Sequence, residues 1–207
     1  LGVDAARFST AAPRPAELAP LADRPYLLFV GNIEPKKGLD TLLDAYAACA
    51  DAIGGLPLVI AGRAAWKSAT VVRRIRRWRG PGTIHWLGRV SATMLPGLYQ
   101  HAVALVMPSI TEGFGMPVLE AMAAGTPVVH SAHPALCEAT GSAGLGFAVG
   151  EPLDLAQKLR TLQQSTALQD DLRAAGRQRA ASFSWHRWGE SAADVLKQVL
   201  QTGKAGS

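Results

Sequence analysis

The sequence predicts an α/β fold, a doubly wound parallel sheet of about six strands followed by a helical C-terminal tail. Three observations support this prediction. Six short apolar runs recur between residues 26 and 149, and they are continuous rather than alternating, which is typical of strands buried on both faces. Segments with helical apolar spacing separate these runs. Beyond residue 152 only helical patterns remain, and no internal repeat is visible.

The expected elements follow one another in a regular order. Residues 1–24 are rich in Ala and Pro without sustained periodicity, which predicts a linker or lead-in. The α/β domain is expected over 25–183, and the last helix with its tail over 184–207. The expected strands are YLLFV (26–30), PLVIAG (57–62), TIHWLG (83–88), VALVMP (103–108), PVVHS (127–131) and GLGFAV (144–149).

The expected helices lie between these strands and in the tail. Apolar residues at helical spacing mark one helix from 39 to 53, a second around 71–78 and a third near 91–102. A short helix over 117–124 begins at Pro117, since proline suits the first turn, and ends before Gly125, a favoured C-terminal cap. Ser184 is a suitable N-cap for the last helix, WHRWGESAADVLKQVL.

Composition and charge exclude several classes of protein. With 207 residues, 48% hydrophobic and 18% charged, the chain is not disordered, collagen-like or a disulfide scaffold. It has no apolar run of the roughly 20 residues that a spanning helix needs, no signal-peptide pattern and no initial Met, so we expect a soluble, cytoplasmic fragment. A net charge of +5 favours anionic partners. Cys49 and Cys137 lack a CxxC or a His cluster, so we expect buried thiols, no metal and no cofactor.

Ligands of a doubly wound sheet bind at the carboxyl ends of its strands, so the loops after the apolar runs are candidate sites. The loop GNIEPKKG, residues 31–38, carries Lys36 and Lys37 between two glycines, where they would face an anion above the sheet. It is neither a Walker loop nor a GxGxxG fingerprint. A solvated basic turn is the alternative interpretation.

The segment SITEGFGMPVLEAMAAGTPVV, residues 109–129, carries the most information. Gly113 and Gly115 permit close backbone approach, and the N-terminal amides of the helix at Pro117 form an anion site. Glu112 and Glu120 lie eight residues apart around this site. Carboxylates beside an anion site are repulsive unless they bind hydroxyl groups, such as those of a sugar. A capping Glu and a surface Glu are the structural alternative.

Two further features are expected to be structural. His130 lies near the end of the fifth run and His133 in the segment SAHPALCEATG (131–141) after it, and isolated histidines near strand ends are more often structural or exposed than catalytic. The run RRIRRWRG, residues 73–80, contains five Arg, but the spacing of the apolar residues places the arginines opposite the core. We expect a solvated helix face rather than a specific nucleic-acid site, with contact to anionic lipid headgroups as the alternative.

Several motifs together resemble glycosyltransferase family 4. The segment EGFGMPVLEAMAAGTPVV is similar to the donor-site signature of that family, in which seven residues separate two glutamates. GVDAARF resembles the linker that opens the family's second domain, and FVGNIEPKKGLDTLLDAY resembles its phosphate-binding strand, loop and helix. LVIAGRAAW, IHWLGRV, LPGLYQHAVALVMPS, PALCEATG and ASFSWHRW fall in the expected order, so the resemblance covers nearly the whole chain.

The resemblance implies the C-terminal, Rossmann-like half of a two-domain, B-type glycosyltransferase. Such enzymes transfer a sugar from a nucleotide-diphosphate donor with retention at the anomeric carbon and need no metal. Glu112 and Lys37 are then the catalytic residues, with Glu112 on the transferred sugar, Lys37 on the diphosphate and Glu120 on the ribose. The other implied donor-binding residues are Gly31, Asn32, Arg63 and Gly88, the last two near the nucleobase, and Gly113, Phe114, Gly115, Met116 and Pro117 at the diphosphate.

One residue departs from the family pattern. Many members have Arg after the first glycine of the phosphate loop, where this chain has Asn32, and the lost charge bears on diphosphate binding. GNIEPKKG followed by AGRAAW is nearest to mannosyl- and rhamnosyltransferase-like members, which favours GDP-mannose as the donor, in bacterial polysaccharide or glycolipid synthesis.

The resemblance also places the acceptor outside this chain. A glycan or lipid-linked saccharide is expected to bind the missing N-terminal domain, with contact at the inner face of the membrane, so the isolated chain should bind donor without catalysing transfer. Two other functions stay open: a catalytically silent nucleotide-binding module, and a sugar-nucleotide epimerase of the same fold.

Overall fold

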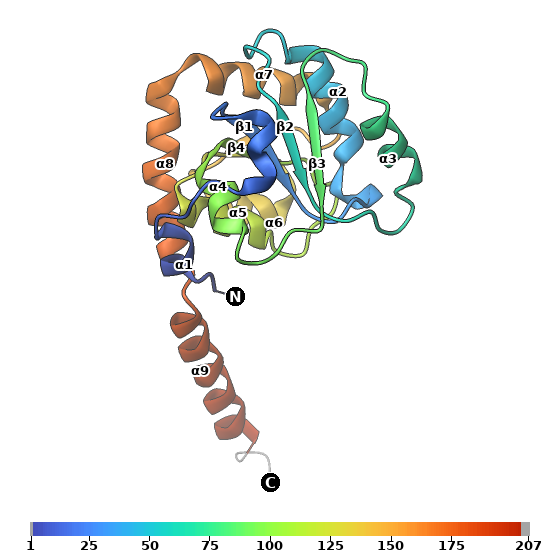
Figure 1. The fold of residues 1–207 in the computed structure, drawn as a ribbon. Helices are drawn as coiled ribbons and strands as arrows, with labels where there is room; N and C mark the ends of the chain where they lie inside the picture. The colour runs from blue at the N-terminus through green and yellow to red at the C-terminus, as the bar shows by residue number, and fades with distance from the viewer. Residues whose placement is uncertain (1, 204–207) are drawn as a thin grey trace.

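A six-stranded parallel sheet forms the centre of the computed structural model, which describes residues 2–203 (Figure 1). The strands lie in the order β3-β2-β1-β4-β5-β6, so the sheet grows in one direction from β1 to β3 and in the other from β4 to β6. They are β1 (Tyr26–Val30), β2 (Leu58–Ala61), β3 (Ile84–Gly88), β4 (Ala102–Met107), β5 (Val128–Ser131) and β6 (Leu145–Phe147). The expected doubly wound α/β fold is confirmed.

Helices and short 3₁₀ segments precede, connect and follow the strands. In order they are α1 (Ala5–Ser9), η1 (Ala16–Leu21), η2 (Pro35–Lys37), α2 (Leu39–Cys49), α3 (Ala69–Arg76), α4 (Leu95–Gln100), α5 (Met116–Ala124), α6 (Pro134–Thr140), α7 (Pro152–Gln164), α8 (Thr166–Ala181) and α9 (Trp185–Gly203). The helix expected near 91–102 is the shorter α4, because Pro96 is tolerated only in a first turn and β4 begins at Ala102.

Apolar layers cover both faces of the sheet. One layer packs α4, α5 and the N-terminal segment against alternate strand residues such as Leu28. The other packs α2, α3 and α7 against the residues between them, such as Phe29. Because successive side chains of a strand point to opposite faces, the continuous apolar runs of the sequence supply both layers.

The N-terminal segment lies against the sheet from residue 2 onward. Phe8 in α1 and Leu18 in η1 are buried in the layer that contains α5. The amide of Val3 donates a hydrogen bond of 2.7 Å to the carbonyl of Phe183, so this segment also joins the end of α8. It therefore contributes directly to the core.

The two cysteines differ in their surroundings. Cys49 is buried in α2, and burial raises the pKa of its thiol to about 11. Cys137 is exposed, so the expectation that both thiols are buried is wrong. The reason is the orientation of α6: its inward side carries Leu136 and Ala139, which leaves Cys137 on the outward side.

The last helix extends away from the sheet (Figure 1). The hydroxyl of Ser184 accepts a hydrogen bond of 3.2 Å from the amide of Arg187, which confirms Ser184 as the N-cap. Trp185 and Trp188 on α9 pack edge to face and are about half exposed. Over residues 2–203, no helix combines the length and the apolar character needed to cross a membrane.

Candidate functional site

The candidate site lies at the carboxyl edge of the sheet, between β1 and β4. These strands are neighbours in space, although β2 and β3 separate them in sequence. After β1 the chain adds β2 and β3 on one side of that strand and then β4 on the other side. Ligands of such sheets bind where the strand order reverses in this way. The first loop (31–38) follows β1 and the second loop (109–115) follows β4, so both loops indicated by the sequence meet at this position.

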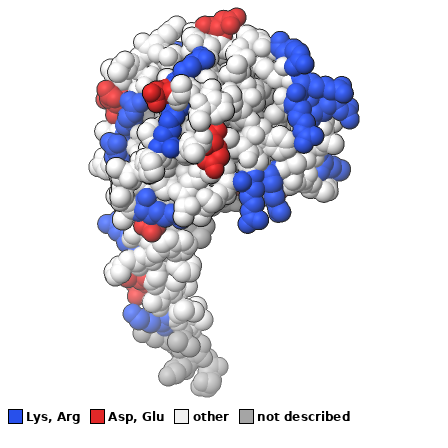
Figure 2. Space-filling view, viewed as in Figure 1, with Lys and Arg blue, Asp and Glu red and all other residues white. Residues whose placement is uncertain are grey.

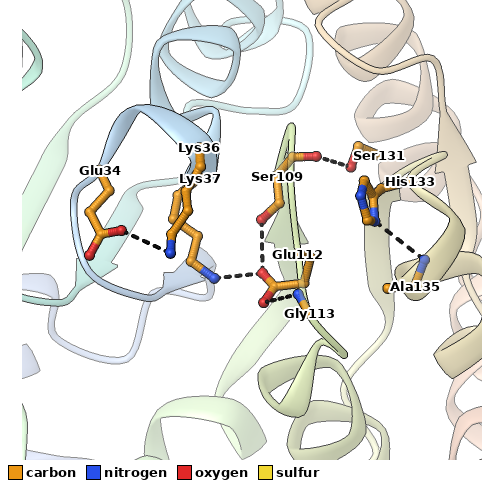
Figure 3. Close-up of polar contacts among 9 residues, drawn as sticks. All are labelled: Glu34, Lys36, Lys37, Ser109, Glu112, Gly113, Ser131, His133 and Ala135. Carbon is orange, nitrogen blue, oxygen red and sulfur yellow. Dashed lines mark hydrogen bonds and ion pairs between the residues drawn. The ribbon is translucent and has the colours of Figure 1, made fainter.

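Lys37 and Glu112 form an ion pair at the meeting point of the two loops. The Nζ atom of Lys37 lies 2.5 Å from Oε2 of Glu112 (Figure 3). The two side chains are only 15% and 12% exposed, so water screens their attraction less than at an open surface. The structure thus places a cation and a carboxylate, expected to serve different parts of one ligand, in direct contact.

Backbone contacts join the two loops. The carbonyl of Lys36 accepts hydrogen bonds from the amides of Ile110, at 2.8 Å, and Thr111, at 3.2 Å. A Cβ atom built on Gly38 would lie 1.9 Å from the carbonyl oxygen of Pro108, and Gly38 has φ +65°. Only glycine meets both requirements, since other residues are strained at this φ and would collide with Pro108, the residue before the second loop. The two loops therefore behave as one unit.

Two further hydrogen bonds orient the Glu112 carboxylate. Oε2 accepts a hydrogen bond of 3.2 Å from the Ser109 hydroxyl, and Oε1 accepts one of 3.3 Å from the amide of Gly113 (Figure 3). Ser109 is fully buried, and its carbonyl accepts a 2.5 Å hydrogen bond from the hydroxyl of Ser131 on β5. Together with Lys37, these groups hold the carboxylate in one direction at the edge of the sheet.

The turn before α5 directs the N-terminus of that helix toward the same edge. Gly115 is the N-cap with φ +89°, and a Cβ atom there would lie 2.7 Å from Cδ2 of Leu136. The ring of Phe114 packs edge to face on Phe183, with 5.9 Å between centroids. Met116 and Pro117 form the first turn of α5. The positive end of the helix dipole thus lies at the end of the second loop, three residues after Glu112.

Glu120 lies one turn further along α5 in a half-buried environment. Its Oε2 accepts a hydrogen bond of 2.8 Å from the hydroxyl of Tyr99 on α4. Burial raises the pKa of Glu120, against smaller lowering effects from the Tyr99 hydrogen bond and from the charge of Arg7. Arg7 comes from α1 and also donates a hydrogen bond to the carbonyl of Ala92. Three separate parts of the chain therefore determine the state of this carboxyl.

A cavity of about 350 Å³ opens beside the first loop, over the ends of β1, β2 and β3. Its polar lining comes from Asn32, Arg63 and Arg89, and Gly31 belongs to the wall. Gly88 directly precedes Arg89, and its carbonyl accepts a hydrogen bond of 2.7 Å from the amide of Gly62. Of the two residues expected near a nucleobase, Arg63 lines this cavity, and Gly88 lies beside its wall without lining it.

The histidines have structural partners. His130 is buried, with Nδ1 2.9 Å from the Ser131 carbonyl and Nε2 3.1 Å from the Thr140 hydroxyl, and burial lowers its pKa. Nδ1 of His133 accepts a hydrogen bond of 3.3 Å from the amide of Ala135 at the start of α6. Within residues 2–203, His, Cys, Asp and Glu side chains do not gather in any group of three that could hold a metal ion.

Sequence reasoning missed four residues of this region. They are Arg89, Ser109, Tyr99 and Arg7. Only two carried a local signal, because Ser109 opens the segment 109–129 and Arg89 follows Gly88. Tyr99 fits the apolar face of a helix, and Arg7 lies more than one hundred residues before Glu120. Their proximity to Glu120 depends on the packing of α1 and α4 on α5.

Comparison with known proteins decides the family. Residues 14–179 match the family described as glycosyl transferases group 1. The chain belongs to this family. The match confirms the coarse assignment made from the loop motifs, and it includes both loops, the cavity residues and Glu120.

Two curated relatives are each about twice as long as this chain. The O-antigen chain mannosyltransferase B of Escherichia coli is 38% identical over 183 residues, which cover 83% of this chain and 47% of that protein. A glycogen synthase of Mycobacterium tuberculosis is 33% identical over 208 residues, covering 99% of this chain and 48% of that protein. The chain thus spans about half the length of the relatives it matches.

Solved structures share the fold of this group 1 chain. The sucrose-phosphate synthase of Thermosynechococcus elongatus superposes with a TM-score of 0.78 at 26% identity, over 97% of this chain and 52% of that one. Anabaena HepE, in a complex with UDP and glucose, superposes with a TM-score of 0.81 at 22% identity, over 95% and 55%. The Rossmann-like half of a B-type glycosyltransferase is therefore the correct description of the fold.

Proposed function

We propose that this chain is the donor-binding half of a retaining, family 4 glycosyltransferase and that it binds a nucleotide-diphosphate sugar between β1 and β4. The Lys37–Glu112 pair carries the proposal. A cation suited to phosphate and a carboxylate suited to sugar hydroxyls lie 2.5 Å apart where the strand order reverses. The junction between diphosphate and sugar in such a donor needs both groups side by side.

The neighbouring features fit the remaining parts of the donor. The cavity lined by Asn32, Arg63 and Arg89 accommodates the nucleobase next to the first loop. Leu95 lines this cavity and Tyr99, one turn later on α4, holds Glu120, which suits the ribose hydroxyls. Arg89 also brings a guanidinium to the cavity wall that contains the uncharged Asn32, so it can replace the charge that many family members have at that position.

The amides of Gly113, Phe114, Gly115 and Met116 and the start of α5 at Pro117 face the diphosphate in this proposal, as Lys37 does. In the transfer step, the bond between the anomeric carbon and the diphosphate oxygen breaks, and a bond from the acceptor oxygen forms on the same face of the sugar. The acceptor proton passes to the leaving diphosphate. Lys37 and the helix N-terminus stabilise the negative charge that develops there, the role a metal ion has in other enzymes.

We further propose GDP-mannose as the donor, supported by the mannosyltransferase among the relatives at 38% identity. The acceptor, a glycan or lipid-linked saccharide, binds the part of the protein outside this chain, since the relatives extend to about twice its length. The full protein then acts in bacterial polysaccharide or glycolipid synthesis in the cytoplasm.

Calorimetric titration of the chain with UDP, GDP, ADP and their sugars, in EDTA, tests the donor site. One nucleoside diphosphate is expected to bind without divalent metal, and we expect GDP to bind more tightly than UDP or ADP. Lys37→Ala should weaken the diphosphate by about ten- to a hundredfold and leave the nucleoside within about twofold, since a charge-assisted bond of about 1.5 to 3 kcal/mol is lost only when phosphate is present. Equal losses for both ligands would remove Lys37 from the phosphate site.

The same titrations separate the proposal from its alternatives. Binding that disappears in EDTA contradicts the metal-free site, and binding of no nucleotide contradicts the donor site as a whole. The full-length protein, mixed with the sugar nucleotide that binds in these titrations, should release nucleoside diphosphate when acceptor is added. Tight donor binding without any transfer indicates the silent module.

A further inference from the structure

Arginines gather on the outer side of α3, away from the Lys37–Glu112 pair. Arg73, Arg76 and the C-cap residue Arg77 are exposed and lie within about one turn on the same side of the helix. Arg79, two residues after Arg77, is exposed as well. We refer to these four residues as the arginine surface. Figure 2 shows Lys and Arg side chains collected on the right, over the position of α3 in Figure 1, with no acidic side chain on that part of the visible face.

The charges of this surface are not neutralised by carboxylates of the described residues. Arg74, on the flank of α3, pairs with Asp40 and Asp44 at 2.6 Å each. For the part of the chain that the structure describes, no such ion pair is formed by the four residues of the arginine surface. Several like charges held close together without carboxylates repel one another, and an anionic partner would lower this repulsion.

The shape of the arginine surface is suited to small anionic groups. Two hollows of about 360 Å³ and 420 Å³ lie along α3, and both are lined by Arg73 and Arg77. Arg79 completes one hollow and Arg76 the other. Guanidinium groups bind phosphate oxygens in a bidentate manner, so each hollow can accept a phosphate from a layer that lies across the helix.

An exposed tryptophan precedes the arginines by a few residues in the sequence. Trp66 lies in the loop that leads into α3 and is 67% exposed, a value that among the large apolar residues of the described chain only Leu153, at 71%, exceeds. The Nζ atom of Lys67 lies 4.5 Å from the centre of its ring. Tryptophan beside basic residues is favoured at the interface between water and lipid, where its ring meets the acyl boundary and its N–H stays hydrated.

We propose that the arginine surface and Trp66 bind the surface of a membrane that contains anionic lipids. A convex helix with a row of cations fits a broad anionic layer. Single-stranded nucleic acid needs free aromatic rings for its bases, but Trp78 packs on Tyr46, with 5.7 Å between centroids, and the guanidinium of Arg76 covers Trp86 at 5.5 Å. The neighbouring rings are thus occupied by residues of the chain itself.

The position of this surface places the membrane next to the proposed donor cavity. Arg63, which lines the cavity, and Trp66, which precedes the arginine surface, belong to the same short loop after β2. A membrane-bound chain would therefore present the cavity close to lipid-linked molecules. Membrane binding itself does not require the donor site, so it can be tested separately from the proposed function.

Co-sedimentation of the chain with vesicles tests the proposal. Vesicles of phosphatidylglycerol and phosphatidylcholine should retain the protein at about 0.1 M salt, whereas pure phosphatidylcholine should not. Arg73→Gln/Arg77→Gln should lower the partition coefficient about thirtyfold, since each basic residue near an anionic membrane contributes about fivefold. Arg73→Lys/Arg77→Lys keeps the charge and should stay within about threefold of the unsubstituted chain.

A matched control separates this surface from overall charge. Lys158→Gln/Arg173→Gln removes two positive charges from α7 and α8, where both residues take part in surface ion pairs. These substitutions, and Trp188→Ala on α9, should change vesicle binding less than twofold. Equal losses for the control pair, equal binding to neutral vesicles, loss only with Trp188→Ala, or stronger binding to single-stranded RNA than to vesicles at about 0.15 M salt would each overturn the proposal.

Discussion

Glu112→Gln is expected to strengthen the binding of a nucleoside diphosphate to this chain. The Lys37 ammonium is already engaged, 2.5 Å from Glu112 Oε2, and both side chains are largely shielded from water. A diphosphate has to take this ammonium from the carboxylate, which also repels it. A hydrogen bond with a charged partner contributes about 1.5 to 3 kcal/mol and a neutral one about 0.5 to 1.5 kcal/mol. Replacing the charged competitor should therefore release about 1 kcal/mol, which lowers Kd about fivefold.

The sugar nucleotide should respond differently. Gln offers the sugar hydroxyls a weaker acceptor, so the loss at the sugar offsets the gain at the diphosphate, and the preference for the donor over the diphosphate falls. The motif alone predicts no effect of Glu112→Gln on the diphosphate, because only the structure shows the ion pair.

Calorimetric titration of the unsubstituted chain and of Glu112→Gln, each with the nucleoside diphosphate and with the sugar nucleotide, compares the affinities. Glu34→Gln is the control. Glu34 belongs to the first loop but pairs with Lys36, at 3.3 Å, rather than with Lys37 (Figure 3). Its replacement should change diphosphate affinity less than twofold. Weaker diphosphate binding by Glu112→Gln, or an equal gain with Glu34→Gln, would refute the competition between carboxylate and phosphate.

Two other predictions concern the second loop and α5. Gly115→Ala should destabilise the fold by about 2 to 4 kcal/mol, from φ +89° and the contact with Leu136 at 2.7 Å, whereas Gly113→Ala, with no atom within 4 Å of its new Cβ, should stay within about 0.5 kcal/mol; similar melting temperatures for both variants would contradict this. Burial raises the pKa of Glu120, so the folded chain binds this proton more tightly than the unfolded chain does. The stability of the folded chain therefore falls as pH rises from the usual Glu pKa through the raised one. Glu120→Gln should therefore gain stability relative to the unsubstituted chain as pH rises above the usual Glu pKa of about 4.3 in denaturant titrations, while weakening diphosphate and sugar nucleotide alike. A difference in stability that is constant with pH would be inconsistent with the buried carboxyl.

Local patterns in the sequence were sufficient for most of the fold. Each strand is a continuous apolar run because both faces of the sheet are covered, and the observed strands agree with the expected ones to within two residues at either end. The start of α5 at Met116 and its end before Gly125 follow from Pro117 and from a glycine with positive φ, which act through the backbone of their own neighbours. The two loops could be named in advance for the same reason, since strand ends of a parallel sheet meet at one edge.

Contacts between distant residues were decided by the tertiary structure alone. Lys37 and Glu112 are 75 residues apart, and they meet only because β1 and β4 are neighbours in the sheet. Glu120 depends in the same way on α1 and α4, which bring Arg7 and Tyr99 beside it. Composition and spacing carry no information on which strand lies next to which, or on how far one helix is rotated against another. The side-chain types of the site could therefore be predicted from the sequence, but their pairing and protonation depend on packing.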